Sequence, residues 1–315
     1  MNESIVEARK IHAVPKSKRS NRYKGGMIEK PTAGGVVADV LIYIFMVFVI
    51  FVSVVPMWHV LMSSFSFGQK LMAHSGLVFW PVGGWNMGGY NLVFQDSNIA
   101  SGYGNTLIYV IGATVVGLVL EVISGYVLSR KIRYKGLLSF FILFTMMFSG
   151  GLVPTYMVIR KLGMVGTRWA LIIPGSTNAA FIFIIMNAFL QVPESTVEAA
   201  EIDGAGHFTL MFRIMLPQAM ALTTVIILNS VLLQWNSWYA ASIYVATKRD
   251  LWPLQLWIKQ IVADNVEFLN TSNPDYNRYL VQYGVITIAT YPILIAFPFF
   301  LKYIEKGVLL GGVKE

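Results

Sequence analysis

The chain has 315 residues, of which 56% are hydrophobic and only 13% charged, and its mean hydropathy is +0.61. Soluble globular proteins carry about 25% charged residues, so this composition excludes an ordinary soluble enzyme and indicates an integral membrane protein. The absence of cysteine excludes disulfides, thiolate metal sites and cysteine nucleophiles. In so apolar a chain, the net charge of +8 indicates basic residues that orient membrane helices rather than a nucleic-acid surface.

Residues 1–35 are polar and basic, and we expect them to form a cytoplasmic N-terminal segment. Six apolar runs follow, each with the roughly 20 residues that a spanning helix needs. The runs cover residues 37–62, 104–128, 137–159, 169–190, 219–245 and 281–301. They predict an all-α integral membrane protein with six transmembrane helices, a membrane domain over residues 36–304 and a cytoplasmic C-terminal tail over 305–315. Prolines inside the runs predict kinks, at Pro56, Pro154, Pro174, Pro292 and Pro298.

The 24 lysines and arginines divide unevenly between the two faces that six spans create. Sixteen lie in the N-terminal segment, the 2–3 loop, the 4–5 loop and the tail, and eight lie on the opposite face. Because cytoplasmic loops carry an excess of Lys and Arg, both termini are predicted to be cytoplasmic. The loop between spans 3 and 4 is a local exception, with Arg160, Lys161 and Arg168 and no acid.

Two segments on the opposite face are long, residues 63–103 and 246–280. Long loops without regular structure are often functional. The second carries Trp252, Trp257, Tyr276 and Tyr279, and aromatic residues are enriched at the centres of protein interfaces. These four residues are therefore candidates for contact with a partner, and anchoring of aromatic rings at the membrane interface is the alternative.

The segment between the fourth and fifth runs, residues 191–217, is predicted to form two short helices around a glycine turn. Pro193 can begin the first helix, whose acidic residues suit its N-terminal end. Gly204 and Gly206 supply the break. The second helix carries one apolar stripe with residues three or four apart: Phe208, Met211, Phe212 and Met215. A helix pair of this kind suits a groove in a partner.

Three short patterns in this segment have a fixed spacing: Glu198-Ala199-Ala200, Asp203-Gly204-Ala205 and Ile214-x-Leu216-Pro217. Together they resemble the EAA loop of ATP-binding-cassette (ABC) importer permeases. The spacing agrees with that family, since Gly204 lies six residues after Glu198 and Pro217 lies thirteen after Gly204.

The resemblance extends over most of the chain and is to carbohydrate-uptake permeases, in particular to the smaller permease subunit of maltose-type transporters. The matching stretches are Asn105-Thr106-Leu107, Gly125-Tyr126-x-Leu128-Ser129-Arg130, Gln234-Trp235-Asn236 and Tyr303-x-x-Lys306-Gly307-x-x-x-Gly311-x-Val313-Lys314. Within that group the chain is most like permeases that serve complex or acidic oligosaccharides.

The resemblance implies a binding-protein-dependent importer in the bacterial cell (inner or plasma) membrane that moves oligosaccharides by alternating access. This chain and a second, different permease subunit would form the pore, two ABC ATPases would bind ATP and Mg beneath it, and an extracytoplasmic solute-binding protein would deliver the sugar and contact loop 246–280. The positions that match the ATPase-coupling helix and its flanks are Glu198, Ala199, Ala200, Asp203, Gly204, Ala205, Ile214, Leu216 and Pro217. The tail positions implied to reach the ATPase are Gly311, Gly312, Val313 and Lys314.

No Gly-x4-Gly-Lys-[Ser/Thr] phosphate loop, His-Glu-x-x-His or Gly-x-Ser-x-Gly motif occurs in the sequence. The four histidines are scattered, which does not favour a metal site. We therefore expect no catalytic residue, cofactor or metal on this chain, and no partner beyond membrane lipid and the proteins above.

Polar residues inside the spans are candidates for a sugar path. Glu121 is the one acid deep in a predicted span, and membrane carboxylates face the bundle interior or a wet cavity. Gln234, Asn236, Trp238 and Tyr239 combine groups that bind sugar hydroxyls with rings that cover apolar sugar faces. The alternatives are a structural glutamate between helices and, for the other four, helix packing with an interfacial aromatic belt.

Two other functions bear on this sequence. A permease for a non-sugar solute would carry the same EAA loop and stays open as an alternative. A secondary transporter would need coupling-ion sites and often shows inverted repeats. No such repeat is evident, and a secondary transporter has no use for an EAA loop, so this class is disfavoured.

Overall fold

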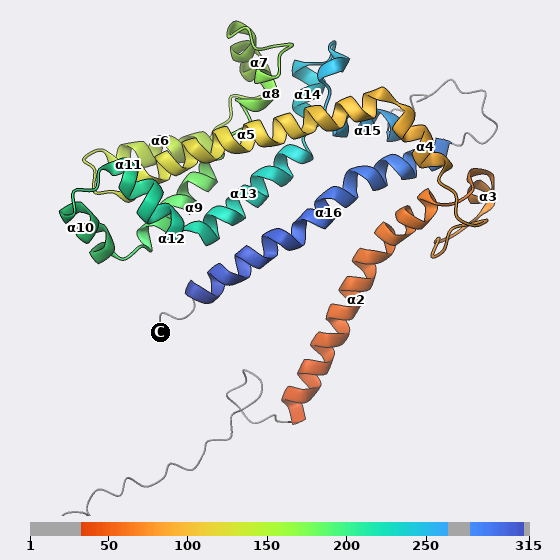
Figure 1. Cartoon of the computed structure of the whole chain (residues 1–315), viewed down its shortest axis with the longest axis horizontal. Coiled ribbons are helices and arrows are strands. Elements are labelled where there is room, and N and C mark those ends of the chain that lie inside the picture. Colours follow the sequence, from red (N-terminus) through yellow and green to blue (C-terminus); the bar gives the residue numbers. More distant parts are fainter. Residues whose placement is uncertain (1–32, 264–277, 312–315) are drawn as a thin grey trace, which may run out of the picture. The chain divides into compact units, whose positions relative to one another are not determined.

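The computed structural model describes residues 33–263 and 278–311, and every regular element within them is helical (Figure 1). The elements are α2 (Ala33–Ser64), α3 (Gly68–Ala73), α4 (Gly88–Gln95), α5 (Ser97–Ser129), α6 (Lys135–Met147), α7 (Leu152–Lys161), α8 (Trp169–Ile172), α9 (Ala179–Leu190), α10 (Glu194–Ile202), α11 (His207–Thr209), the π-helix η1 (Leu210–Met215), α12 (Leu216–Gln218), α13 (Met220–Trp235), α14 (Tyr239–Tyr244), the 3-10 helix η2 (Arg249–Leu251), α15 (Leu254–Val262) and α16 (Arg278–Gly311). The chain divides into two units, Met1–Pro56 and Met57–Glu315, and the second holds every element after α2. Most of the predicted N-terminal segment 1–35 falls outside the described residues.

Three helical segments are long and apolar enough to cross a membrane: Gly35–Ser64, Ser97–Ser129 and Arg278–Lys302. They contain the predicted first, second and sixth spans. With 33 residues, α5 is about 50 Å long at about 1.5 Å per residue, so it exceeds the roughly 30 Å hydrocarbon core. The chain is thus an all-helical membrane protein.

Three further segments pass the same test only as bent pairs of helices. α6 and α7 meet at 114°, α9 and α10 at 77°, and α11–α12 meets α13 at 86°. The described residues therefore contain three candidate spans, or as many as six if each bent pair crosses once.

The helices predicted over 137–159, 169–190 and 219–245 are each interrupted, at residues 148–151, 173–178 and 236–238. The first interruption contains Gly151 in the left-handed region at φ +83°, and the second contains Pro174, which cannot continue a helix. The third contains neither glycine nor proline. Pro154 lies in the first turn of α7, where its missing N–H costs no helical hydrogen bond.

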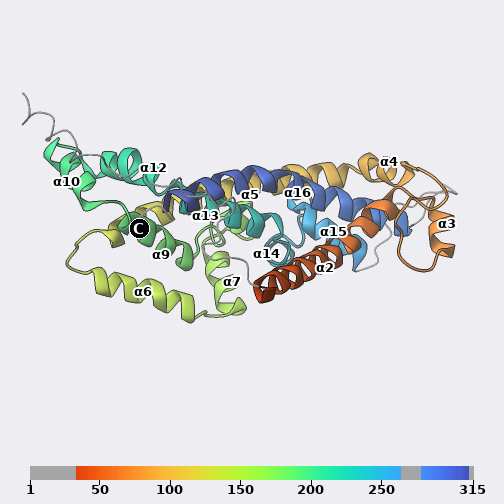
Figure 2. The same cartoon turned by 90° about the horizontal axis from the view of Figure 1, so that it is seen from below.

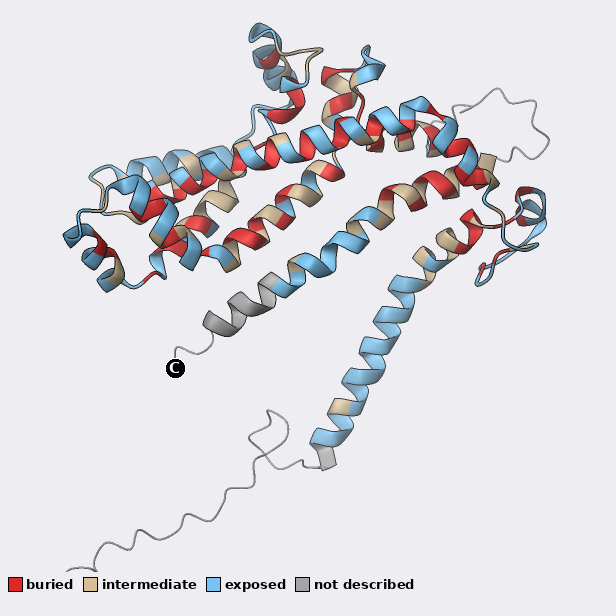
Figure 3. Ribbon diagram, viewed as in Figure 1, coloured by how far each residue is buried: buried red, intermediate tan, exposed pale blue. Residues whose placement is uncertain are grey.

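The second unit packs around α5, which is buried along one stripe of residues spaced four apart. The stripe consists of Asn105, Tyr109, Ala113, Gly117, Glu121 and Gly125. Figure 3 shows buried colour recurring along most of α5. A Cβ atom placed on Gly117 would lie 2.0 Å from the backbone oxygen of Ser176, and one on Gly125 would lie 2.7 Å from Cγ2 of Ile185. Only glycine therefore allows α5 to approach the segment 176–185 this closely.

α6 packs beside α9 (Figure 2). Unlike α5, it has no buried residue. Its exposed side chains are mostly Phe, Leu and Met. Such a face suits a lipid environment, in which apolar side chains need no cover.

Candidate functional site

The loop 191–217 folds as a helix, a glycine turn and a second helical segment. α10 begins after Pro193 and carries Glu194 in its first turn, where the helix dipole favours a negative charge. It ends in a Schellman motif, in which the Ala205 N–H donates to the Ala200 carbonyl at 2.9 Å and the Gly204 N–H to that of Glu201 at 3.1 Å. Gly204 has φ +80°, the left-handed conformation that this motif requires.

The second segment runs through α11, η1 and α12 before the chain turns into α13. The single apolar stripe expected here is divided in two. Met211 and Met215 are buried, whereas Phe208 and Phe212 are exposed and stack with ring centroids 6.5 Å apart. The π-helical turn changes the residue period in the middle of the stripe, so its members do not share one face.

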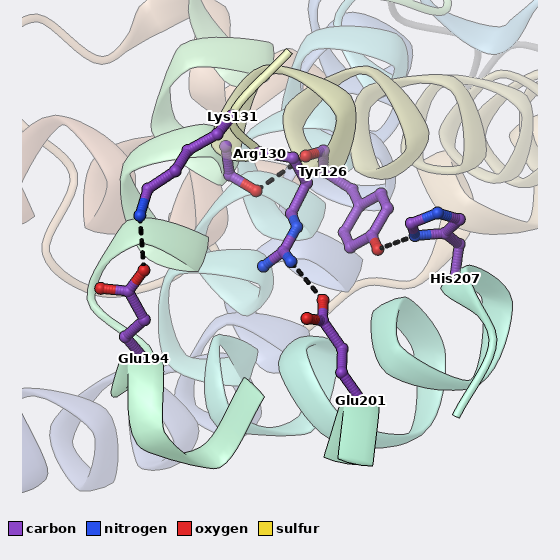
Figure 4. Close-up of polar contacts among 7 residues, drawn as sticks. Tyr126, Arg130, Lys131, Glu194, Glu201 and His207 are labelled. Carbon is purple, nitrogen blue, oxygen red and sulfur yellow. Dashed lines mark hydrogen bonds and ion pairs between the residues drawn. The ribbon is translucent and has the colours of Figure 1, made fainter. Parts of the chain in front are cut away.

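Side chains at the end of α5 hold this loop (Figure 4). The Arg130 guanidinium pairs with Glu201, and Lys131 Nζ lies 2.8 Å from Oε1 of Glu194. On the other side of the Arg130–Glu201 pair from Lys131, the Tyr126 hydroxyl lies 2.9 Å from Nδ1 of His207. In the sequence, Arg130 and Lys131 count toward the membrane orientation, and Arg130 also ends one of the family-matching stretches, but neither is predicted to pair with the loop. A signal for these ion pairs exists in the sequence. Glu194 and Glu201 lie seven residues apart, on one face of a short helix, and the 2–3 loop carries two adjacent cations.

The Lys131–Glu194 pair stays charged at neutral pH. The ammonium hydrogen-bonds to the carboxylate and lowers the pKa of Glu194, and the carboxylate raises the pKa of Lys131. The stabilisation is therefore lost as pH falls through the lowered Glu194 pKa, or as pH rises through the raised Lys131 pKa. Because the two side chains are 92% and 68% exposed, salt screens the pair and it contributes little by itself.

The rest of the loop leaves a mixed surface open. Glu198, Ala199, Asp203 and Gly204 are exposed, and Ala200 is buried. Ile214 and Leu216 are partly buried, Ala205 likewise, and Pro217 is exposed. Beside these lie two large apolar side chains, Ile202 at 86% and Phe208 at 74% exposure. In the described part of the chain, neither ion pair involves Glu198.

Glu121 and Gln234 both bind the interruption at residues 173–178. Oε1 of the fully buried Glu121 accepts the Asn178 backbone N–H at 2.9 Å, and its Oε2 has no hydrogen-bond partner among residues 33–263 and 278–311. Nε2 of Gln234 donates to the Gly175 carbonyl at 2.7 Å. These two candidate sugar-path residues thus satisfy backbone groups that a continuous helix would have paired. Buried as it is, Glu121 lines no open path in this conformation.

The other three sugar-path candidates stand at the interruption after α13. Asn236, Trp238 and Tyr239 are exposed, and Nζ of Lys259 lies 5.6 Å from the centre of a Trp238 ring. Asn236 also lines a cavity of about 240 Å³ with residues of α13, α15 and α16. This region therefore brings together an amide, two aromatic rings and a cation.

The four aromatic residues of loop 246–280 do not share one surface. Trp252 and Trp257 are buried in the core of the second unit, and Nε1 of Trp252 donates to the Val245 carbonyl at 3.0 Å. A buried indole cannot present its face to a partner without unpacking, so these two are core residues here. Tyr279 is 52% exposed, and Tyr276 lies outside the described residues.

The tail positions lie at the end of the described chain. Gly311 is the last residue of α16. Gly312, Val313 and Lys314 fall outside the described residues.

No protein-family model matches the chain. The polygalacturonan/rhamnogalacturonan transport system permease protein YtcP of Bacillus subtilis (strain 168) is 31% identical over 284 residues, which cover 88% of this chain and 98% of the relative. A solved bacterial ABC transporter involved in the import of the acidic polysaccharide alginate has a chain with a TM-score of 0.79 and 24% identity, covering 87% of this chain and 99% of that one. A bacterial alginate ABC transporter solved with an alginate pentasaccharide-bound periplasmic protein gives a TM-score of 0.56 at 14% identity, covering 86% and 96%. At these identities the two structures show the fold alone.

Proposed function

Because the chain belongs to the carbohydrate-uptake permeases of binding-protein-dependent ABC importers, we propose that it forms one half of an oligosaccharide pathway across the cell membrane. The permease subunit is not itself an ATPase. Its proposed partners are a second, different permease subunit, two ATPases that bind ATP and Mg, and an extracytoplasmic solute-binding protein. The proposed topology has six spans with both termini in the cytoplasm, supported by the excess of Lys and Arg on that face.

The exposed surface of α10 and α11 carries this proposal. Ile202 and Phe208 are apolar and open, and Glu198 stands beside them without an ion-pair partner in the described chain. Exposed apolar side chains on a short helix suit insertion into a groove, and an unpaired carboxylate suits a cation at its rim. The proposed occupant of this surface is an ATPase subunit, with the tail residues 311–314 as a second contact.

The proposed cargo is an acidic oligosaccharide. The name of YtcP refers to polygalacturonan and rhamnogalacturonan, and the alginate transporter imports an acidic polysaccharide. In this chain, Trp238 lies 5.6 Å from the Lys259 ammonium, its ring contacts that of Tyr239, and Asn236 lines a cavity. Amides and aromatic rings suit sugar hydroxyls and ring faces, and an ammonium suits a carboxylate. We place the sugar path along these residues, while Glu121 and Gln234 support it by holding the interruption in the fourth span.

Transport by the reconstituted complex tests the proposal. The purified chain is expected to carry ATPase subunits with it. Proteoliposomes that hold the complex, its binding protein outside and ATP inside are expected to accumulate an oligogalacturonate. Uptake driven by an ion gradient without ATP would instead indicate a secondary transporter. ATP-driven uptake of neutral oligosaccharides only would refute the acidic cargo and leave the importer intact.

Contact with the binding protein is expected at Tyr279. A photoreactive residue at this position should crosslink to the binding protein in the assembled transporter, because the side chain is exposed on the proposed outer face. Tyr134 is a matched control, since it is also exposed but lies in the proposed cytoplasmic 2–3 loop. Equal crosslinking at the two positions, or none at Tyr279 in any nucleotide state, would refute the proposed contact.

A further inference from the structure

The outer end of α5 is hydrogen-bonded to a segment more than 140 residues away. Nδ2 of Asn105 donates to the Asp250 carbonyl at 2.7 Å and to that of Trp252 at 3.2 Å. The Tyr109 hydroxyl donates to the Leu251 carbonyl at 2.7 Å. One side of a single helix therefore holds three consecutive carbonyls of the segment 250–254.

Two further features strengthen this attachment. The Thr106 hydroxyl accepts the Leu254 N–H at 2.9 Å, and a Cβ atom on Gly102 would lie 3.2 Å from the Cα of Leu254. Asn105, Thr106 and Tyr109 are all buried, so water cannot replace these bonds when they break. The segment 250–254 must follow the outer end of α5.

The opposite end of the same helix is attached to α10. Arg130 and Lys131 pair with Glu201 and Glu194, and the Tyr126 hydroxyl reaches His207. Between the two ends, α5 has no interruption, and its buried stripe includes two glycines that leave no gap against residues 176–185. Figure 1 shows the helix running from the region of α10 and α11 to that of α15.

The covalent route between the same two sites is less direct. From α10 the chain passes through a glycine turn, the π-helix η1, a bend of 86° into α13 and the interruption at 236–238. Each of these can absorb a movement by a change of backbone angles. The continuous, packed helix α5 cannot absorb a movement in this way.

We propose that Asn105 and Arg130 are positioning residues at the two ends of α5, and that this helix transmits a movement of the loop 191–217 to the outer segment 250–254. The inference rests on the proposed function, because it assumes that an ATPase moves α10. The coupling is reciprocal, so a binding protein that displaces segment 250–254 from outside would shift α10 through the same contacts.

The test measures ATP hydrolysis by the full complex in lipid nanodiscs, with and without loaded binding protein. In the unmodified chain, Arg168 donates to Oδ1 of Asn105 at 3.0 Å. Asn105→Asp keeps the size of the side chain and this acceptor oxygen, but it removes both N–H donors of the amide. Arg130→Glu reverses the charge at the other end. In both variants, basal ATP hydrolysis is expected to stay within about twofold of the wild type. The stimulation of hydrolysis by loaded binding protein is expected to fall about tenfold.

Rescue and matched controls separate transmission from simple damage. Arg130→Glu combined with Glu201→Arg restores the ion pair in reverse and should restore stimulation. Tyr109→Phe removes one of the hydrogen bonds and should give a smaller loss than Asn105→Asp. Arg133→Gln removes a charge from the same loop that is in neither described ion pair, and Ser101→Ala removes a hydroxyl whose hydrogen bond in the described chain goes to the Asn98 carbonyl of α5 itself. Both controls should be stimulated like the wild type.

Three outcomes would overturn the inference. Full stimulation of Asn105→Asp would show that the outer attachment transmits nothing. Equal losses of basal and stimulated hydrolysis, with no rescue by the reversed ion pair, would assign these residues a structural role only. A wild-type complex that loaded binding protein does not stimulate would remove the proposed function, and this inference with it, whereas the first two outcomes leave the proposed function standing.

Discussion

Alanine at position 117 is expected to destabilise the second unit by about 3 kcal/mol or more and to abolish uptake. The added Cβ would lie 2.0 Å from the Ser176 oxygen and 2.9 Å from its carbonyl carbon. These are backbone atoms, which cannot rotate away as a side chain can. α5 must therefore separate from the segment before α9, which also strains the Glu121–Asn178 hydrogen bond. The melting temperature and membrane yield of purified Gly117→Ala measure the effect.

Gly104 provides the matched control on the same helix. A Cβ atom there meets nothing within 4 Å, and alanine favours helix over glycine by about 1 kcal/mol. Gly104→Ala should thus be neutral or slightly stabilising. If the two variants melt alike, the close approach of α5 to residues 173–178 is refuted.

Glu198→Ala and Gly204→Pro are expected to reduce ATP-driven uptake about tenfold or more while the protein still inserts and folds. Removal of an exposed carboxylate without an ion-pair partner in the described chain should change stability by about 0.5 kcal/mol or less. Proline at 204 cannot adopt φ +80° and lacks the N–H that bonds to Glu201, so it opens the end of α10. The damage stays local because Gly204 is exposed and surrounded by open space.

The measurements are uptake, ATPase stimulation and melting temperature on the same preparations. Gly206→Ala is the control for the glycine turn, since Gly206 has φ −71° and also faces open space. It should transport normally. Wild-type uptake and stimulation in both test variants would refute the assignment of this loop to ATPase coupling.

Local chemistry predicted much of the fold. Hydropathy alone located α2, α5 and α16, because a continuous apolar run leaves the backbone in a membrane few choices but helix. Pro193 and Gly204 predicted the start and end of α10, since the fixed φ of proline suits a helix start and Gly204 adopts a left-handed conformation that most residues avoid. These signals are contained within a few residues.

The parts that sequence reasoning missed depend on residues far apart in the chain. The interruption after α13 contains no glycine or proline, so no local signal marks it. From the sequence, Trp252 and Trp257 are predicted to be exposed in a long loop, as contacts for a partner. They are buried because hydrogen bonds from Asn105 and Tyr109 hold their segment against α5. Gln234 stays a candidate for the sugar path, and its hydrogen bond to Gly175 joins residues 59 apart in the chain, so no local pattern predicts it.

The pairing of Arg130 with Glu201 also restricts how the chain threads the bilayer. Two residues that touch lie on one side of the membrane, so the chain between them crosses it an even number of times. Either the α6–α7 pair and α9 both cross the membrane, or neither does. If α9 crosses, the α6–α7 pair, which bends by 114°, cannot be a re-entrant hairpin that returns to the same side. The bond from Asn105 to Asp250 extends the same rule: if α5 crosses once between them and the α6–α7 pair and α9 agree, α13 must cross back. This parity is independent of the distribution of lysine and arginine.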